Sequence, residues 1–122
     1  MQKRDELEEE LGLLRNRKEA LEDSARQMER LQEEEDFQIQ NACRRLENAW
    51  YEYGQDNAEW GAMLEEEKNV VDKFKGECVD CEEQFYREYR REMEELEAEE
   101  ESLWGQIRGL DDERGEEDTQ WK

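Results

Sequence analysis

The chain has 122 residues, of which 47% are charged and none is proline or histidine. This length is enough for one small domain, and a composition rich in Glu, Arg, Leu and Lys is typical of long helices rather than of a compact globule. The net charge of −21 argues against duplex DNA, RNA and anionic membranes as partners, because like charges repel.

The first predicted helix covers residues 2–53 and carries apolar residues at two positions of a seven-residue repeat. One position holds Leu7, Leu14, Leu21, Met28, Ala42 and Ala49, and the other holds Leu11, Ala25, Ile39, Leu46 and Tyr53. Lys18, Gln32 and Glu35 are the polar exceptions. Lys18 can extend its ammonium group out of the apolar stripe, whereas Gln32 and Glu35 predict a weakly packed segment in mid-helix.

A turn is predicted at residues 54–56. Gly54 is expected to end the first helix in the left-handed conformation. Asp56 together with Glu59 fits an N-capping box for the next helix. These signals agree with the apolar patterns on either side, which both lead to this point.

The second predicted helix covers residues 57–110. Its apolar positions are Trp60, Leu64, Val71, Phe74, Cys78, Cys81, Phe85, Tyr89, Met93, Leu96, Leu103, Ile107 and Leu110, with Glu67 and Glu100 as exceptions. Phe85, Tyr89 and Met93 step by four and four, which adds residues to the heptad and should unwind a supercoil locally. Residues 111–122 are acidic and lack the pattern, so a disordered tail is predicted there.

The two stripes match when the chain is folded back at Gln55, so that residue i lies near residue 110 minus i. The predicted pairs are Leu7 with Leu103, Leu14 with Leu96, Leu21 with Tyr89, Ala25 with Phe85, Ile39 with Val71, and Leu46 with Leu64. We therefore predict an all-α fold, an antiparallel two-helix hairpin resembling a coiled coil, about 75 Å long. One stripe per helix cannot close a core, so we expect the hairpin to complete a helical bundle with a partner.

The sequence offers no arrangement typical of catalysis. It has no His, no Gly-rich phosphate loop, and no Ser or Cys beside an evident base. A two-helix rod also lacks a pocket that could shift a pKa for acid–base work. We expect no enzymatic activity, no cofactor and no metal.

The cysteines Cys78 and Cys81 form a C-x-x-C pair on the apolar stripe. A zinc site needs four ligands, and a redox pair usually lies at a helix N-terminus, whereas these two lie in mid-helix. We interpret them as small buried apolar residues, with a redox or metal role as the alternative.

Aromatic residues gather around the predicted turn and again where the heptad changes phase. They could pack the tip of the hairpin as a local staple, or they could anchor a partner, because Trp and Tyr are favoured in binding hot spots. The residues that we expect to contact a partner are Trp50, Tyr53, Trp60, Leu64, Phe74, Phe85 and Tyr89.

A hairpin of about this size, with aromatic residues at its tip and an acidic second helix ending Glu100-Glu101-Ser102-Leu103-Trp104, resembles the targeting factors of LXG toxins. These are small WXG-like partner proteins of Gram-positive type VIIb secretion. The resemblance implies a non-catalytic adaptor, or targeting chaperone, that binds the helical N-terminal domain of an LXG toxin for export. Trp60-Gly61 lacks the middle residue of a W-x-G, and no aromatic residue is followed four residues later by Asp or Glu. The export signal would therefore belong to a second small hairpin protein.

No apolar run reaches the roughly 18 residues of a membrane span, and no signal peptide opens the chain. Three cysteines, an odd number, suit a reducing compartment. We expect a cytoplasmic protein, exported together with its partner if the resemblance holds. Two alternatives remain: a homo-oligomeric structural coiled coil, and an acidic inhibitor that imitates nucleic acid.

Overall fold

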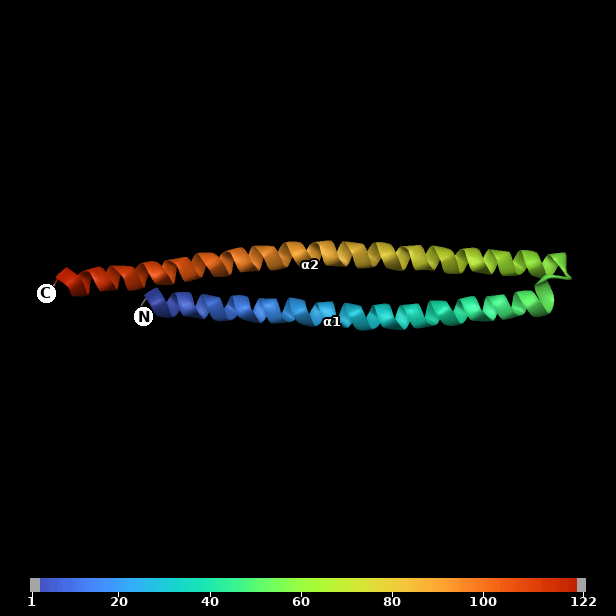
Figure 1. Ribbon diagram of the computed structural model, residues 1–122, viewed down its shortest axis with the longest axis horizontal. Helices are drawn as coiled ribbons and strands as arrows, with labels where there is room; N and C mark the ends of the chain where they lie inside the picture. The colour runs from blue at the N-terminus through green and yellow to red at the C-terminus, as the bar shows by residue number, and fades with distance from the viewer. Residues whose placement is uncertain (1–2, 121–122) are drawn as a thin grey trace. The chain divides into compact units, whose positions relative to one another are not determined.

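The computed structural model describes the backbone of residues 3–120 and the side chains of residues 3–112, and all of its regular structure is helical (Figure 1). Helix α1 spans Lys3–Ala49, a π-helical turn η1 spans Trp50–Gly54, and helix α2 spans Ala58–Gln120. No strand occurs within the residues described. The predicted all-α fold with two long helices is confirmed.

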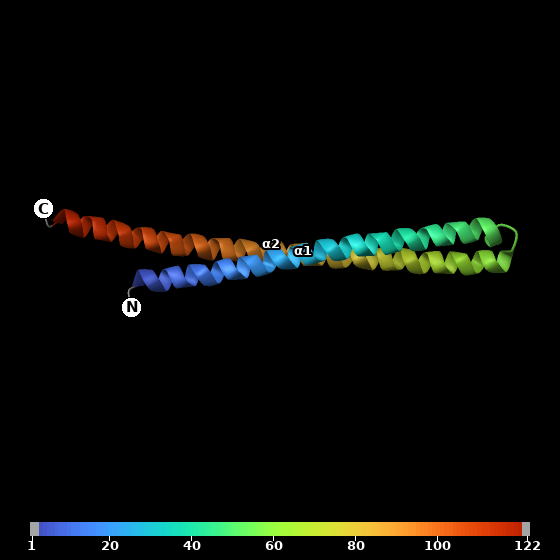
Figure 2. The ribbon, with the colours of Figure 1, turned by 90° about the horizontal axis from the view of Figure 1, so that it is seen from below.

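The chain divides into two units, each of which holds one segment of α1 and one segment of α2. The terminal unit contains the chain up to Ala25 and from Glu88 onward, and the turn unit contains Arg26–Arg87. In the turn unit, η1 and the loop at residues 55–57 reverse the chain direction between the two helices (Figure 2). The two helix segments are antiparallel and packed in each unit, as predicted.

The terminal unit is held together by a core of aliphatic side chains from both helices. Six of them are buried and form one cluster: Leu7, Leu11, Leu14, Leu96, Leu103 and Ile107. Leu21 and Leu110 are partly buried and pack against this cluster. All eight belong to the predicted heptad stripes, because residues three or four apart on a helix share one face. We call the row of residues by which each helix faces the other the seam.

The turn unit has a much smaller core. Ile39 is its buried large apolar residue, and Gly54 and Gly61 are the other buried residues among those described. On α2, the partly buried positions Leu64, Val71 and Cys78 are seven residues apart. Over residues 62–81, α2 therefore offers α1 one partly buried position per heptad, whereas a knobs-into-holes seam uses two. The predicted second set of positions on α2, which includes Phe74 and Cys81, is exposed.

The turn differs from its prediction in two ways. Gly54 is not left-handed, since no described residue has a positive φ, and the chain instead continues through η1 with a hydrogen bond from the Gln55 amide to the Trp50 carbonyl. Helix α2 is capped by Asn57 rather than by Asp56: the backbone amides of Glu59 and Trp60 donate to Asn57 Oδ1 at 3.0 and 3.3 Å. An N-cap side chain must reach the second or third amide of the helix, and Asn57 directly precedes Ala58.

Close backbone packing explains the glycines at the turn. A Cβ on Gly54 would lie 2.7 Å from Trp50 Cε3, and a Cβ on Gly61 would lie 3.1 Å from the Gly54 carbonyl oxygen. At Gly54 the Trp50 indole occupies the space that a side chain would fill, and at Gly61 the backbone of η1 and the same indole leave little room for one. The residue predicted to end α1 by its left-handed backbone therefore acts through its lack of a side chain.

The polar exceptions of the predicted stripes pair across the helices. In the terminal unit, Lys18 Nζ donates to Glu100 Oε2 at 3.4 Å, and both side chains are about one quarter exposed. Arg4 Nη1 donates to Asp111 Oδ1 at 2.6 Å. In the turn unit, the Tyr86 hydroxyl donates to Gln32 Oε1 at 3.3 Å. Lys18 therefore does not extend into solvent as predicted but has a carboxylate partner inside the seam.

These pairs show that the predicted register is displaced. The rule of 110 minus i places residues 106, 92 and 78 opposite Arg4, Lys18 and Gln32, whereas the observed partners lie five to eight residues further along. Part of the displacement comes from the loop, whose centre is residue 56 rather than Gln55. The rest has a general cause: side chains lean toward the N-terminus of their own helix, which moves every contact toward later residues of α2.

Helix α2 continues to Gln120, past its predicted end near residue 110. Asp111, Asp112 and Glu113 follow Leu110 without a proline, and a lone glycine such as Gly115 costs a helix only about 1 kcal/mol. The predicted acidic tail therefore begins inside α2, while its last two residues lie outside the described residues. Neither helix, over its described length, contains a segment long and apolar enough to cross a membrane.

Candidate partner-binding surface

Large apolar side chains are exposed mainly in the turn unit. Twelve such residues are exposed among those whose side chains are described, and only Leu13 and Trp104 belong to the terminal unit. The ten in the turn unit are Leu31, Phe37, Trp50, Tyr51, Tyr53, Trp60, Met63, Val70, Phe74 and Val79. Exposed apolar side chains mark a binding site where neighbouring ones form a contiguous patch, as those that share a helix face do.

The seven residues predicted to contact a partner do not form one patch. Four are exposed in the turn unit: Trp50, Tyr53, Trp60 and Phe74, at 39%, 57%, 50% and 44% of their full area. Leu64 and Phe85 are partly buried in the same unit, and Tyr89 is partly buried in the terminal unit. The prediction therefore identified the exposed aromatic residues of the turn but also included residues of the seam.

The aromatic residues at the turn are only partly packed against one another. The rings of Tyr53 and Trp60 have centroids 6.0 Å apart and planes inclined by 37°, a tilted contact between η1 and the first turn of α2. This contact resembles the staple that the sequence suggested, yet half of the Trp60 side chain stays exposed. The Tyr53 and Trp60 rings thus pack against each other and also remain available on the surface.

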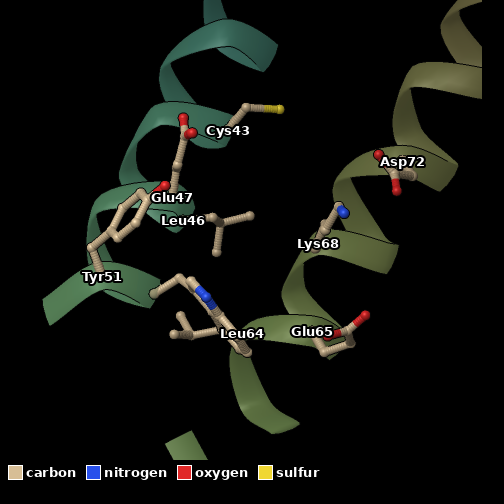
Figure 3. Close-up of a pocket in the computed structure, with 9 residues that line it drawn as sticks. Cys43, Leu46, Glu47, Tyr51, Leu64, Glu65, Lys68 and Asp72 are labelled. Carbon is tan, nitrogen blue, oxygen red and sulfur yellow. The ribbon is translucent and has the colours of Figure 1, made fainter. Parts of the chain in front are cut away.

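A groove of about 500 Å³ runs between the two helices next to the turn. Its apolar base comes from Leu46 and Trp50 on one side and Leu64 on the other. Figure 3 shows Cys43 and Leu46 extending from α1 toward α2, with Lys68 and Asp72 on the opposite wall. Leu46 and Leu64 were predicted to lie together, and the groove brings them together.

The rim of this groove carries more acidic than basic side chains. Glu47 lies on the α1 side, while Glu65, Lys68 and Asp72 lie on the α2 side (Figure 3). A complementary ligand would therefore have apolar groups for the base and a positive charge at the edge. Electrostatic complementarity of this kind contributes to partner selection and to the association rate.

A second aromatic group lies further from the turn, inside the seam. Phe85 and Tyr86 are in edge-to-face contact, with ring centroids 5.3 Å apart and planes at 82°. The Tyr86 hydroxyl reaches across to Gln32 on α1. These two aromatic residues are thus engaged within the turn unit, and Phe85 contributes to its packing rather than standing free for a partner.

The three cysteines occupy different environments. Cys78 is partly buried, and burial raises the pKa of its thiol to about 11, helped by a hydrogen bond to Glu35 and by the negative charge of that carboxylate. Cys43 and Cys81 are exposed. The interpretation of both C-x-x-C cysteines as buried apolar residues is therefore wrong for Cys81, because a seam with one residue per heptad on α2 leaves its position uncovered.

The sequence interpretation missed Met63 and Val70, which are 53% and 67% exposed. Each directly precedes a seam residue, Leu64 or Val71, so both were hidden in short apolar runs. Their spacing of seven residues, and their distances of three and four residues from Trp60 and Phe74, could have revealed a second row on α2.

No group of three or more His, Cys, Asp or Glu side chains within the part of the chain that the structure describes is placed to hold a metal ion. No known protein family, curated protein or solved structure matches the chain.

Proposed function

We propose that this protein is a non-catalytic helical adaptor whose turn unit binds a helical segment of another protein. The observation that carries the proposal is the imbalance within the turn unit, which exposes ten large apolar side chains and buries only Ile39 among its large apolar residues. Burial of apolar surface contributes about 25 cal/mol per Å². A bound helix would supply the apolar contacts that the two helices of this unit do not make with each other.

A docking interface of ordinary size is compatible with this surface. Specific interfaces bury roughly 1,200–2,000 Å² in total, and a few aromatic anchors usually provide most of the binding energy. Trp50, Tyr53 and Trp60 are exposed at one end of the turn unit. Trp and Tyr are residue types that often serve as such anchors. The net charge of −21 keeps this apolar surface soluble and favours partners with basic segments.

The partner to test first is the helical N-terminal domain of an LXG toxin, with the protein acting as a targeting chaperone for type VII secretion. This part of the proposal rests on the resemblance to LXG-toxin targeting factors. A hairpin-like pair of helices with exposed aromatic residues at the turn is consistent with it. On this proposal the protein binds its toxin in the cytoplasm and is exported together with it, while a second small hairpin protein provides the export signal.

The test is complex formation between the full-length chain and the helical N-terminal domain of an LXG toxin, measured by size-exclusion chromatography with light scattering. Wild type is expected to form a stable complex, and Trp60→Ala combined with Tyr53→Ala should weaken it by at least about tenfold, because both rings are exposed at the turn. Leu13→Ala, an exposed leucine of the terminal unit, is the matched control and should bind like wild type. Circular dichroism checks that each variant keeps its helices.

Two results would contradict the proposal. Unchanged binding by the double variant would remove the aromatic surface from the interface. A stable homodimer or tetramer of the isolated chain that ignores every helical partner would make the protein a homo-oligomeric coiled coil instead.

A further inference from the structure

Helix α2 carries a second apolar row beside its seam in the turn unit. The row consists of Trp60, Met63, Val70 and Phe74, separated by three, seven and four residues. Residues at these separations share one helix face. All four are between 44% and 67% exposed, whereas the seam residues Leu64, Val71 and Cys78 are partly buried. We call these four residues the second row.

The second row is distinct from the groove next to the turn. Residues 65, 68 and 72 of α2 line that groove together with Leu64. At 100° per residue these positions lie on one flank of the seam, and the second row lies on the other flank. The apolar surface of α2 therefore extends past the seam on the side away from the groove.

The spacing of the second row indicates what can cover it. Alternating steps of three and four residues are the pattern by which one helix packs along another. A flat sheet or a loop has no such period. A helix lying along α2 would place its own side chains between Trp60, Met63, Val70 and Phe74 over two heptads.

The charges along the second row favour a basic occupant. Glu67 occupies the row itself, between Met63 and Val70. Glu59, Glu66 and Glu77 lie along its outer flank, where Lys73 is the basic residue. Charges that flank a helical interface set the choice of partner. A second copy of this chain would bring the same acidic residues and its own net charge of −21 to the contact, so self-association is disfavoured.

We propose that the second row of α2 is the docking site for an amphipathic helix of another protein, whose apolar positions follow a heptad repeat and whose flanks carry Lys or Arg. The inference rests on the proposed adaptor function and names the surface and the chemistry of its partner. The bound helix packs along α2 and places a basic side chain opposite Glu67.

The test uses the full-length chain and two synthetic helical peptides of about three heptads. Both peptides have Leu at the apolar heptad positions, and their flanking positions carry Lys in one and Glu in the other. Fluorescence anisotropy of the labelled peptides gives the dissociation constants. The chain is expected to bind the Lys peptide and not the Glu peptide.

Two valines on α2 provide a matched pair of variants. Val70 belongs to the second row and Val79 does not, although both are exposed residues of the turn unit. Val70→Glu should weaken binding of the Lys peptide by at least about tenfold, and Val79→Glu should change it by less than about twofold. A purely electrostatic attraction would grow with either added carboxylate, so a loss at Val70 reports the apolar contact. Circular dichroism monitors helicity.

Three outcomes would overturn the docking site: equal binding by wild type and Val70→Glu, equal losses in both valine variants, or self-association of the chain that Val70→Glu abolishes. These results are distinguishable from failure of the adaptor function. If the chain still binds its helical partner while Val70→Glu has no effect, the docking site is wrong and the adaptor function stands.

Discussion

The terminal unit and the turn unit are built from the same two helices but bury their apolar residues to different extents. In the terminal unit, most seam positions on both helices hold Leu or Ile, and six of these side chains are buried. In the turn unit, α1 offers Ala42 and Ala49 beside larger residues, and residues 62–81 of α2 offer one seam residue per heptad. A seam needs large side chains at both positions of both helices, so the same topology gives a closed core in one unit and an exposed apolar surface in the other.

The difference in apolar burial between the two units indicates that they have different roles. The terminal unit has its own apolar core and pairs its polar exceptions, Lys18 with Glu100, inside the seam. The turn unit buries Ile39 as its large apolar residue and packs Gly54 and Gly61 closely against Trp50. We infer that the terminal unit stabilises the protein and that the turn unit is available for binding.

The largest expected effect is in the core of the terminal unit. Leu11 is 3% exposed, so Leu11→Ala should lower the free energy of unfolding by about 2–5 kcal/mol. Leu13→Ala on the same helix, at 62% exposure, should change it by less than about 0.5 kcal/mol, and so should Phe74→Ala in the turn unit. Urea denaturation followed by circular dichroism measures all three. A Phe74→Ala loss as large as that of Leu11→Ala would show that the turn unit has a core of its own.

A smaller change in the free energy of unfolding is expected for two glycines of the turn unit, with opposite signs. Gly54→Ala would place a Cβ 2.7 Å from the Trp50 ring and should destabilise the protein by about 1–3 kcal/mol. Gly76→Ala meets no atom within 4 Å and should stabilise it by up to about 1 kcal/mol through helix propensity. Thermal unfolding distinguishes the two. Stabilisation by Gly54→Ala would rule out the close approach of Trp50.

The helix cap gives the next smaller effect. Asn57→Ala removes the acceptor of the Glu59 and Trp60 amides and should cost about 1 kcal/mol. Asp56→Ala is the matched control at the neighbouring position and should be nearly neutral. Equal losses of unfolding free energy in the two variants, measured by urea denaturation, would support the capping box at Asp56 that the sequence predicted.

The last prediction concerns the reactivity of the three cysteines and not the stability of the protein. At pH 8, Cys43 and Cys81 should be alkylated by iodoacetamide faster than Cys78, because they are exposed, whereas Cys78 is partly buried and its pKa, raised to about 11, leaves it little thiolate. Glu35→Gln removes a hydrogen bond and a negative charge that raise this pKa, so it should speed the reaction of Cys78. Peptide mass spectrometry over time gives the rates. Equal rates at Cys78 and Cys81 would show that the seam does not protect Cys78.

Much of the fold could be predicted from the sequence because heptad spacing is a local property. Leu7, Leu11 and Leu14 were assigned to the stripe and are buried, and Ile39 was assigned correctly as well. Trp50 and Trp60 were predicted to lie at the turn, either packed at the tip or in contact with a partner, and both are exposed. The second row was missed because Met63 and Val70 stand next to seam residues, and only their exposure separates the two rows.

The sequence by itself determined that this chain forms two amphipathic helices joined near Gly54 and which face of α1 is apolar, because both follow from residue spacing and turn chemistry. Only the tertiary structure decided the register, the capping residue and which apolar residues of α2 stay exposed. The physical reason is the repeat itself: sliding one helix past the other by seven residues returns apolar residues to apolar residues. The register is selected by two features. One is the pairing of polar side chains across the helices, Lys18 with Glu100 and Gln32 with Tyr86, and the other is the length of the loop.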